Sequence, residues 1–178
     1  MQVAVLILFA TRELGLSAGA IGVVYACGGL GCVLASASAQ RLSARLGIGP
    51  VIVHGLILSA FAWQAFGLIG GPPLIATLAL GAAMLIFDFG AVLWGINYLS
   101  LRQAITPDRL LGRMTATMRF FTVASAPLGS LVGGALATGI GLRGTLLTVG
   151  VLGLMLSAAA VVWSPVRRHH TLPAPAAE

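Results

Sequence analysis

The sequence predicts an all-α protein, a polytopic bundle of membrane helices, and two observations support this prediction. Of its 178 residues, 58% are hydrophobic and only 8% are charged, whereas a soluble domain carries about 25% charged residues. Several apolar runs are also long enough to cross the hydrocarbon layer of a bilayer, which requires about 20 residues of helix. Such a chain cannot cover a soluble fold with polar groups, so we expect an integral membrane protein.

The spans follow in chain order. Residues 3–10 form an apolar segment of about 12 Å, which is too short to cross alone. It is either a re-entrant piece or a helix cut short, and we favour the truncated helix. The full-length spans are then expected at residues 17–39, 51–69, 74–99, 117–140 and 145–163.

The arginines predict the orientation of these spans. Eight of the ten lie in alternate connectors and the tail, and only Arg12 and Arg143 lie in the others. The positive-inside rule therefore places the Arg-rich loops and the C-terminus in the cytoplasm, and we expect a bacterial-type inner membrane. Residues 1–166 would form one membrane domain and residues 167–178 a disordered cytoplasmic tail. The Arg-rich group comprises Arg41, Arg45, Arg102, Arg109, Arg113, Arg119, Arg167 and Arg168.

Composition also excludes several function classes. A net charge of +6 without any lysine, and with arginines scattered between apolar runs, does not make the basic face of a nucleic-acid binder. Cys27 and Cys32 are five residues apart on one helix, hence on different faces, which argues against a disulfide or a metal pair. Without paired carboxylates, a His/Glu metal motif or a nucleophile elbow, we expect neither an enzyme nor a cofactor.

Small residues recur inside the spans. Gly22, Ala26, Gly29 and Ser36 share one stripe of the second segment, where a second helix could approach closely. Later in the chain, Pro127, Gly129 and Gly133 lie within one apolar run, and we expect the proline to kink or loosen its helix. These features favour a bundle that moves.

Asp88 is the sharpest anomaly in the sequence. It lies about 20 Å from the cytoplasmic end of its span, at Arg102, where a carboxylate costs at least ~2.5–3.5 kcal/mol unless it is hydrated, paired or protonated. It is either a protonatable group facing a water-filled cavity or a structural hydrogen-bond partner of a neighbouring helix. Asn97 is a second polar candidate for the substrate or proton site, but it lies about half a turn away around the helix.

The charged segment of residues 100–120 has the features of a helix start. Thr106 is a good N-cap, Pro107 suits the first helical position, and Asp108 complements the positive end of the helix dipole. We expect a helix to begin here on the membrane surface and to continue into the next span. Its arginines would face lipid phosphates or acidic partners.

This segment also resembles a loop of a known family. The order Arg102, Gln103, Pro107, Asp108, Gly112, Arg113, Arg119, then Pro127, Gly129 and Gly133 is similar to the loop between helices ten and eleven of major facilitator superfamily exporters. The branch that it resembles most is that of enterobactin-exporter-like and macrolide-efflux-like permeases. Arg41, Arg45 and Gly47 are similar to a degenerate second copy of the superfamily's loop motif, with Ala39 and Gln40 where an acidic residue is often found.

The resemblance implies the C-terminal half of a twelve-helix transporter, helices seven to twelve, with helix seven truncated. It implies proton-coupled efflux of small amphipathic molecules, such as drugs or siderophore-like compounds, by alternating access of two halves. Arg41, Arg45, Arg102, Asp108, Arg113 and Arg119 would then form the cytoplasmic gate and anchor. The partners implied are the lipid bilayer, a small-molecule substrate, protons, and a missing N-terminal half or a second copy. The alternative is a non-transporting helical module that binds a partner or dimerises.

Overall fold

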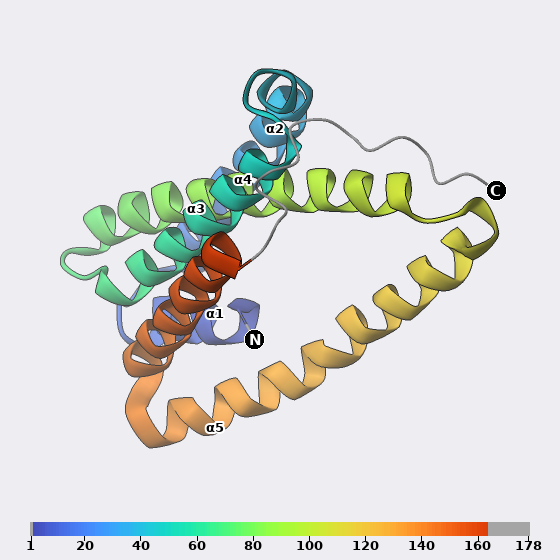
Figure 1. Cartoon of the computed structure of the whole chain (residues 1–178). Coiled ribbons are helices and arrows are strands. Elements are labelled where there is room, and N and C mark those ends of the chain that lie inside the picture. The colour runs from blue at the N-terminus through green and yellow to red at the C-terminus, as the bar shows by residue number, and fades with distance from the viewer. Residues whose placement is uncertain (1, 164–178) are drawn as a thin grey trace.

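The computed structural model describes residues 2–163, and these residues fold entirely into α-helices joined by short turns (Figure 1). The predicted all-helical membrane bundle is confirmed, because α2 to α5 are each long and apolar enough to cross a bilayer. The tail expected at residues 167–178 lies outside the described residues. The helices are α1 (Gln2–Arg12), α2 (Ala18–Leu46), α3 (Ile48–Leu68), α4 (Pro73–Ile105) and α5 (Asp108–Trp163).

Two of the expected spans are joined in α5. Its backbone is helical except at Gly141, whose φ of 77° and ψ of 167° reverse the direction of the chain. Only glycine adopts this combination readily, because a Cβ would collide with the backbone. We call residues 108–140 the first arm and residues 142–163 the second arm. They contain the spans expected at 117–140 and 145–163.

α4 packs against α2 and α3, and α3 packs in turn against the second arm of α5. Cys27 meets Gly81 and Ser43 meets Asn97, so α2 and α4 run parallel. Gly55 of α3 meets the backbone of Gly90 and Trp94, so α3 runs antiparallel to α4. The second arm of α5 in turn packs antiparallel to α3.

The core lies at the end of the bundle where α1, the end of α3, the start of α4 and the Gly141 turn meet. Phe9, Phe66, Leu80 and Leu146 are almost completely buried there. Burying a side chain of this size stabilises the fold by about 1.5–3 kcal/mol. The short α1 therefore belongs to the bundle and is held by its apolar face.

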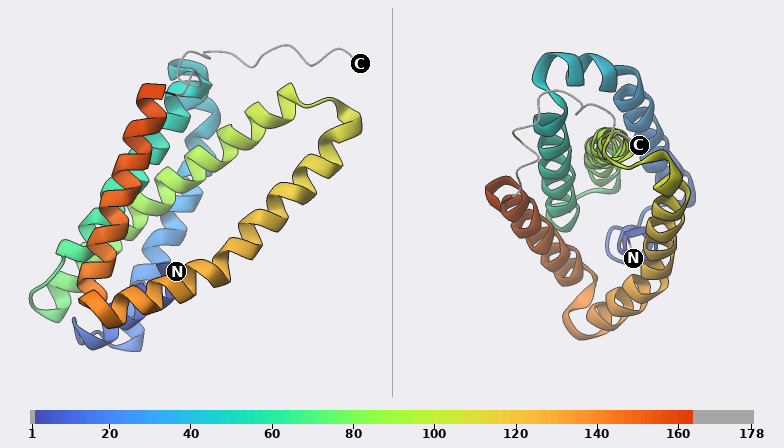
Figure 2. Two further views of the ribbon diagram at one scale, coloured as in Figure 1. Left: turned by 60° about the horizontal axis from the view of Figure 1, so that its bottom comes forward. Right: turned by 45° about the vertical axis from the view of Figure 1, so that its right-hand side comes forward.

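The first arm of α5 stands apart from the other helices for most of its length (Figure 2). Every residue from 117 to 128 is exposed, including Phe120 at 68% and Phe121 at 64%. A run of this kind does not remain exposed to water. Lipid or another protein segment must cover it.

The glycines that bring α2 against α4 differ from those of the predicted stripe. A Cβ at Gly31 would overlap the carbonyl oxygen of Leu85, and one at Gly28 would overlap the carboxylate of Asp88. At Gly22 and Gly29, in contrast, a Cβ would meet nothing within 4 Å. The predicted stripe faces away from the described helices, because the buried face of α2 is displaced from it by two residues, or about 160° around the helix.

Two further expectations differ from the structure. The sharp turn of α5 lies at Gly141, whereas the φ and ψ angles at Pro127 stay helical. Thr106 ends α4 rather than capping α5: its hydroxyl donates to the Arg102 carbonyl at 2.7 Å. A threonine hydroxyl bonds readily to a carbonyl one turn back on its own helix, which removes it from the next helix. Asp108 does begin α5, as expected.

Candidate functional site

Asp88 lies halfway along α4, about 22 Å from its start at Pro73. Its side chain is half-buried at the edge of the contact between α2 and α4. Within residues 2–163 its carboxylate makes no hydrogen bond and no ion pair. The structural alternative, a hydrogen bond to a neighbouring helix, therefore has no support among the described contacts.

Gly28 of α2 makes room for this carboxylate. An added Cβ at Gly28 would overlap Oδ2 of Asp88 and lie 3.0 Å from Cγ of Met84. One turn further along, the backbones of Gly31 and Leu85 are also in close contact. The position of Asp88 thus depends on a glycine that the sequence analysis did not single out.

Two further groups of α2 lie within electrostatic range of the carboxylate. The Tyr25 phenol and the Cys32 thiol both lie close enough to Asp88 to interact with it electrostatically. The phenol oxygen of Tyr25 is buried and has no hydrogen-bond partner in the described part of the chain. A buried hydroxyl without a partner is costly, so Tyr25 has an unused hydrogen-bonding group one turn before Gly28 on α2.

Asn97 does not join this group. It is 5% exposed, its amide donates to the Leu93 carbonyl at 2.9 Å, and its carbonyl accepts from the Ser43 hydroxyl at 2.5 Å. Ser43 lies fifteen residues beyond Gly28 along α2, or about 22 Å. Asn97 therefore links α2 to α4 near the α2–α3 turn, well away from Asp88.

Arg102 is the best-anchored member of the predicted gate. Its guanidinium lies 5.2 Å from the Tyr98 ring centre, and that ring stacks on Trp94 with 5.5 Å between centres. Its Nη2 also lies 2.5 Å from the sulfur of Met114 in α5. These contacts fix the corner between α4 and α5.

The other charged members of the predicted gate and anchor are exposed. They lie at the end of α2, in the first turn of α5 and along its first arm, and none makes an ion pair within the described residues. Arg45 lies in the last turn of α2, where a cation complements the helix dipole. The structure does not bring these charged residues together. The set comprises Arg41, Arg45, Asp108, Arg113 and Arg119.

Arg143 is a junction that the sequence analysis missed. Its guanidinium donates to the carbonyls of Gly67 and Ile69 at 3.1 and 2.9 Å, at the end of α3. It also pairs with Glu13 at 3.5 Å, next to the end of α1. The one sign of this junction in the sequence was Glu13, an acidic residue among the few charged residues at that end of the bundle. Its hydrogen bonds to backbone carbonyls could not be predicted from the sequence, because every residue carries a carbonyl group.

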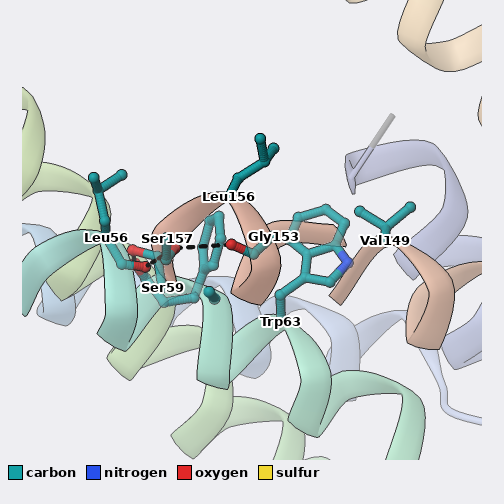
Figure 3. A pocket seen from close by; sticks show the side chains of 9 residues that line it. Leu56, Ser59, Trp63, Val149, Gly153, Leu156 and Ser157 are labelled. Atoms are coloured by element: carbon teal, nitrogen blue, oxygen red, sulfur yellow. Dashed lines mark hydrogen bonds between the residues drawn. The ribbon is translucent and has the colours of Figure 1, made fainter. Parts of the chain in front are cut away.

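Two hollows without Asp88 in their lining lie between the helices. One, of about 380 Å³, is bounded by α3, α4 and the second arm of α5, with Trp63, Gly153 and Ser157 in its wall (Figure 3). Ser157 donates to the Gly153 carbonyl of its own helix at 2.8 Å, so its hydroxyl is already used. The second, of about 410 Å³, lies between α2 and α3. No cluster of metal-binding side chains occurs within the described residues.

Comparison with known proteins identifies the family of this bundle. The Major Facilitator Superfamily model matches residues 1–178. The chain belongs to the Major Facilitator Superfamily. This membership agrees with the four helices of the described chain that are long and apolar enough to cross a bilayer.

One superfamily relative is the multidrug efflux pump Tap of Mycolicibacterium fortuitum. The two proteins are 30% identical over 149 residues, which cover 84% of this chain and 34% of Tap. The chain thus spans about a third of the length of that relative. No solved structure shows a significant match.

Proposed function

We propose that the chain forms the C-terminal half of an exporter that moves small amphipathic molecules by alternating access, coupled to protons. Superfamily membership and the similarity to an efflux pump support transport and efflux. The two arms of α5 and the Arg-rich turn before it agree with helices ten to twelve of such a half. The same assignment turns the C-terminus toward the cytoplasm of a bacterial-type inner membrane.

The observation that carries the coupling proposal is the position of Asp88. A carboxylate midway along a membrane helix, without an ion-pair partner in the described chain, is most stable there when it binds a proton or a cation. Gly28 leaves space beside it, and the unpartnered Tyr25 hydroxyl offers a hydrogen bond. A proton or a cationic group of the substrate would therefore bind at this point of α4.

Transport into vesicles tests the proposal. The complete transporter, with an N-terminal half supplied, is reconstituted and the flux of an amphipathic dye is followed at several pH gradients. Asp88→Asn should reduce pH-driven flux at least tenfold, because the amide cannot exchange a proton. Glu178→Gln, which removes a carboxylate outside the apolar spans, is the matched control and should leave flux unchanged. Unaltered flux and pH response in Asp88→Asn would contradict the site.

The exposed stripe of α2 supports a second candidate function. Gly22 and Gly29 have no neighbour within 4 Å of an added Cβ, and the first arm of α5 is bare. This surface fits a helical module that binds a partner or a second copy without transporting. Flux in the presence of an N-terminal half would reject this alternative, and stable self-association without flux would support it.

A further inference from the structure

The second hollow, between α2 and α3, is a groove that forms because these two helices separate after the turn that joins them. Both helices pack along α4, yet they have few contacts with each other beyond the turn at Gly47. The space between them is floored by α4 through Phe89 and Leu93. Gly55 holds α3 close to that floor, since its added Cβ would lie 2.7 Å from the Gly90 carbonyl oxygen.

The walls of the groove are apolar and run along the helix direction. Leu42 and Leu46 come from α2, and Leu58 and Phe61 come from α3. From His54 to Phe61 the α3 wall is about 10 Å long. Phe61 is 61% exposed, so the groove continues directly into the apolar surface that an integral membrane protein presents to lipid. Its shape suits a hydrocarbon chain lying parallel to the helices.

One end of the groove carries positive charge. Arg45 lies three residues after Leu42 and directly before Leu46, so it borders the groove on the helix surface. Arg41 lies one turn back from Arg45. No carboxylate lines the groove, so no acidic group within it neutralises these arginines.

His54 stands in the wall near the same end, about 9 Å from the start of α3. Its Nδ1 lies 2.6 Å from the Pro50 carbonyl oxygen. A carbonyl oxygen only accepts, so Nδ1 carries a hydrogen and Nε2 is left to interact with another group. Nε2 has no hydrogen-bond partner within the described residues.

We propose that this groove binds one anionic phospholipid from the leaflet around the α2–α3 turn. The acyl chain would lie along Leu42, Leu58 and Phe61, and the phosphate would contact Arg45 and His54. Charge complementarity favours an anionic headgroup over a zwitterionic one, because each cation near a membrane surface contributes about 1 kcal/mol to anionic-lipid binding. The site does not involve Asp88, since Phe89 and Leu93 lie on another face of α4, about 100° and 140° around the helix from Asp88.

Lipid titration with native mass spectrometry tests the proposal. The full chain is delipidated and titrated with phosphatidylglycerol or with phosphatidylethanolamine of identical acyl chains. Phosphatidylglycerol should bind at least fivefold more tightly, and Arg45→Gln should weaken it about fivefold. Arg12→Gln, an exposed arginine at the opposite end of the bundle, is the matched control. Equal affinities for the two lipids, or an equal loss in the control, would overturn the proposal.

A steric variant keeps the test decisive if Arg45→Gln does not fold. Leu58→Trp fills the groove at a half-exposed position without changing charge, and it should weaken both lipids while helicity by circular dichroism stays unchanged. In the unmodified chain, 0.5 M salt should abolish the preference for phosphatidylglycerol because the headgroup contact is screened. A preference that survives high salt, or a Leu58→Trp chain that binds as well as the unmodified one, would reject the groove as the site.

Discussion

At the scale of single residues, Gly28 and Asp88 compete for one volume. In Gly28→Ala the new methyl group would displace the end of a flexible carboxylate rather than the backbone, so folding should change by less than about 1 kcal/mol. The carboxylate, however, would have to rotate out of the space that Gly28 leaves for it. We therefore expect pH-driven flux to fall severalfold while the melting temperature stays nearly constant.

Two neighbouring glycines serve as controls for this prediction. Gly29→Ala adds a methyl group where nothing lies within 4 Å, and it should leave both flux and melting temperature unchanged or slightly raise the latter. In Gly31→Ala the methyl group meets the Leu85 backbone, which cannot move aside, and we expect a loss of about 1–3 kcal/mol. A flux defect in Gly29→Ala equal to that of Gly28→Ala would show that the carboxylate position is not the cause.

At the scale of helices, Arg143 ties the end of α3 to the start of the second arm of α5. Arg143→Gln would leave the carbonyls of Gly67 and Ile69 without their charged donor. We expect a local loss of about 1–2 kcal/mol, reduced because the arginine is 42% exposed. Hydrogen exchange at residues 65–70 should therefore accelerate roughly 5- to 30-fold. Arg12→Gln, an exposed arginine at the same end, should show no change, and equal acceleration there would contradict the role.

The helices themselves were readable from the sequence, but their contacts were not. Length and hydropathy were sufficient to locate all the spans, because the bilayer fixes how long an apolar run must be. The glycines of the α2–α4 contact could not be predicted, since small residues occur all around α2 and only the position of α4 selects Gly28 and Gly31. Thr106 was misassigned because its hydroxyl could bond to either adjoining helix. Asp88 was found by its depth alone, whereas Tyr25 and Cys32 needed the fold.

At the scale of the whole molecule, two surfaces have no neighbour among the described residues. They are the outward face of α2, with Gly22 and Gly29, and most of the first arm of α5. Gly29→Trp would place a large ring on the bare stripe of α2, where an added Cβ meets nothing within 4 Å. We expect the isolated chain to keep its melting temperature but to lose association with an N-terminal half or a second copy. Size-exclusion chromatography of the co-expressed partners measures this. Unchanged association would mean that lipid, not protein, covers the stripe.

The first arm of α5 is fixed at both ends and bare between them. Arg102 and Met114 hold one end, and Gly141 with Arg143 holds the other. A helix that is held at both ends can only bend between them, and its largest displacement falls near mid-length. Pro127 lies close to that point and cannot donate a backbone hydrogen bond to the preceding turn. The arm therefore lacks a backbone hydrogen bond close to the point where it bends most, and it would flex there while both ends stay in place.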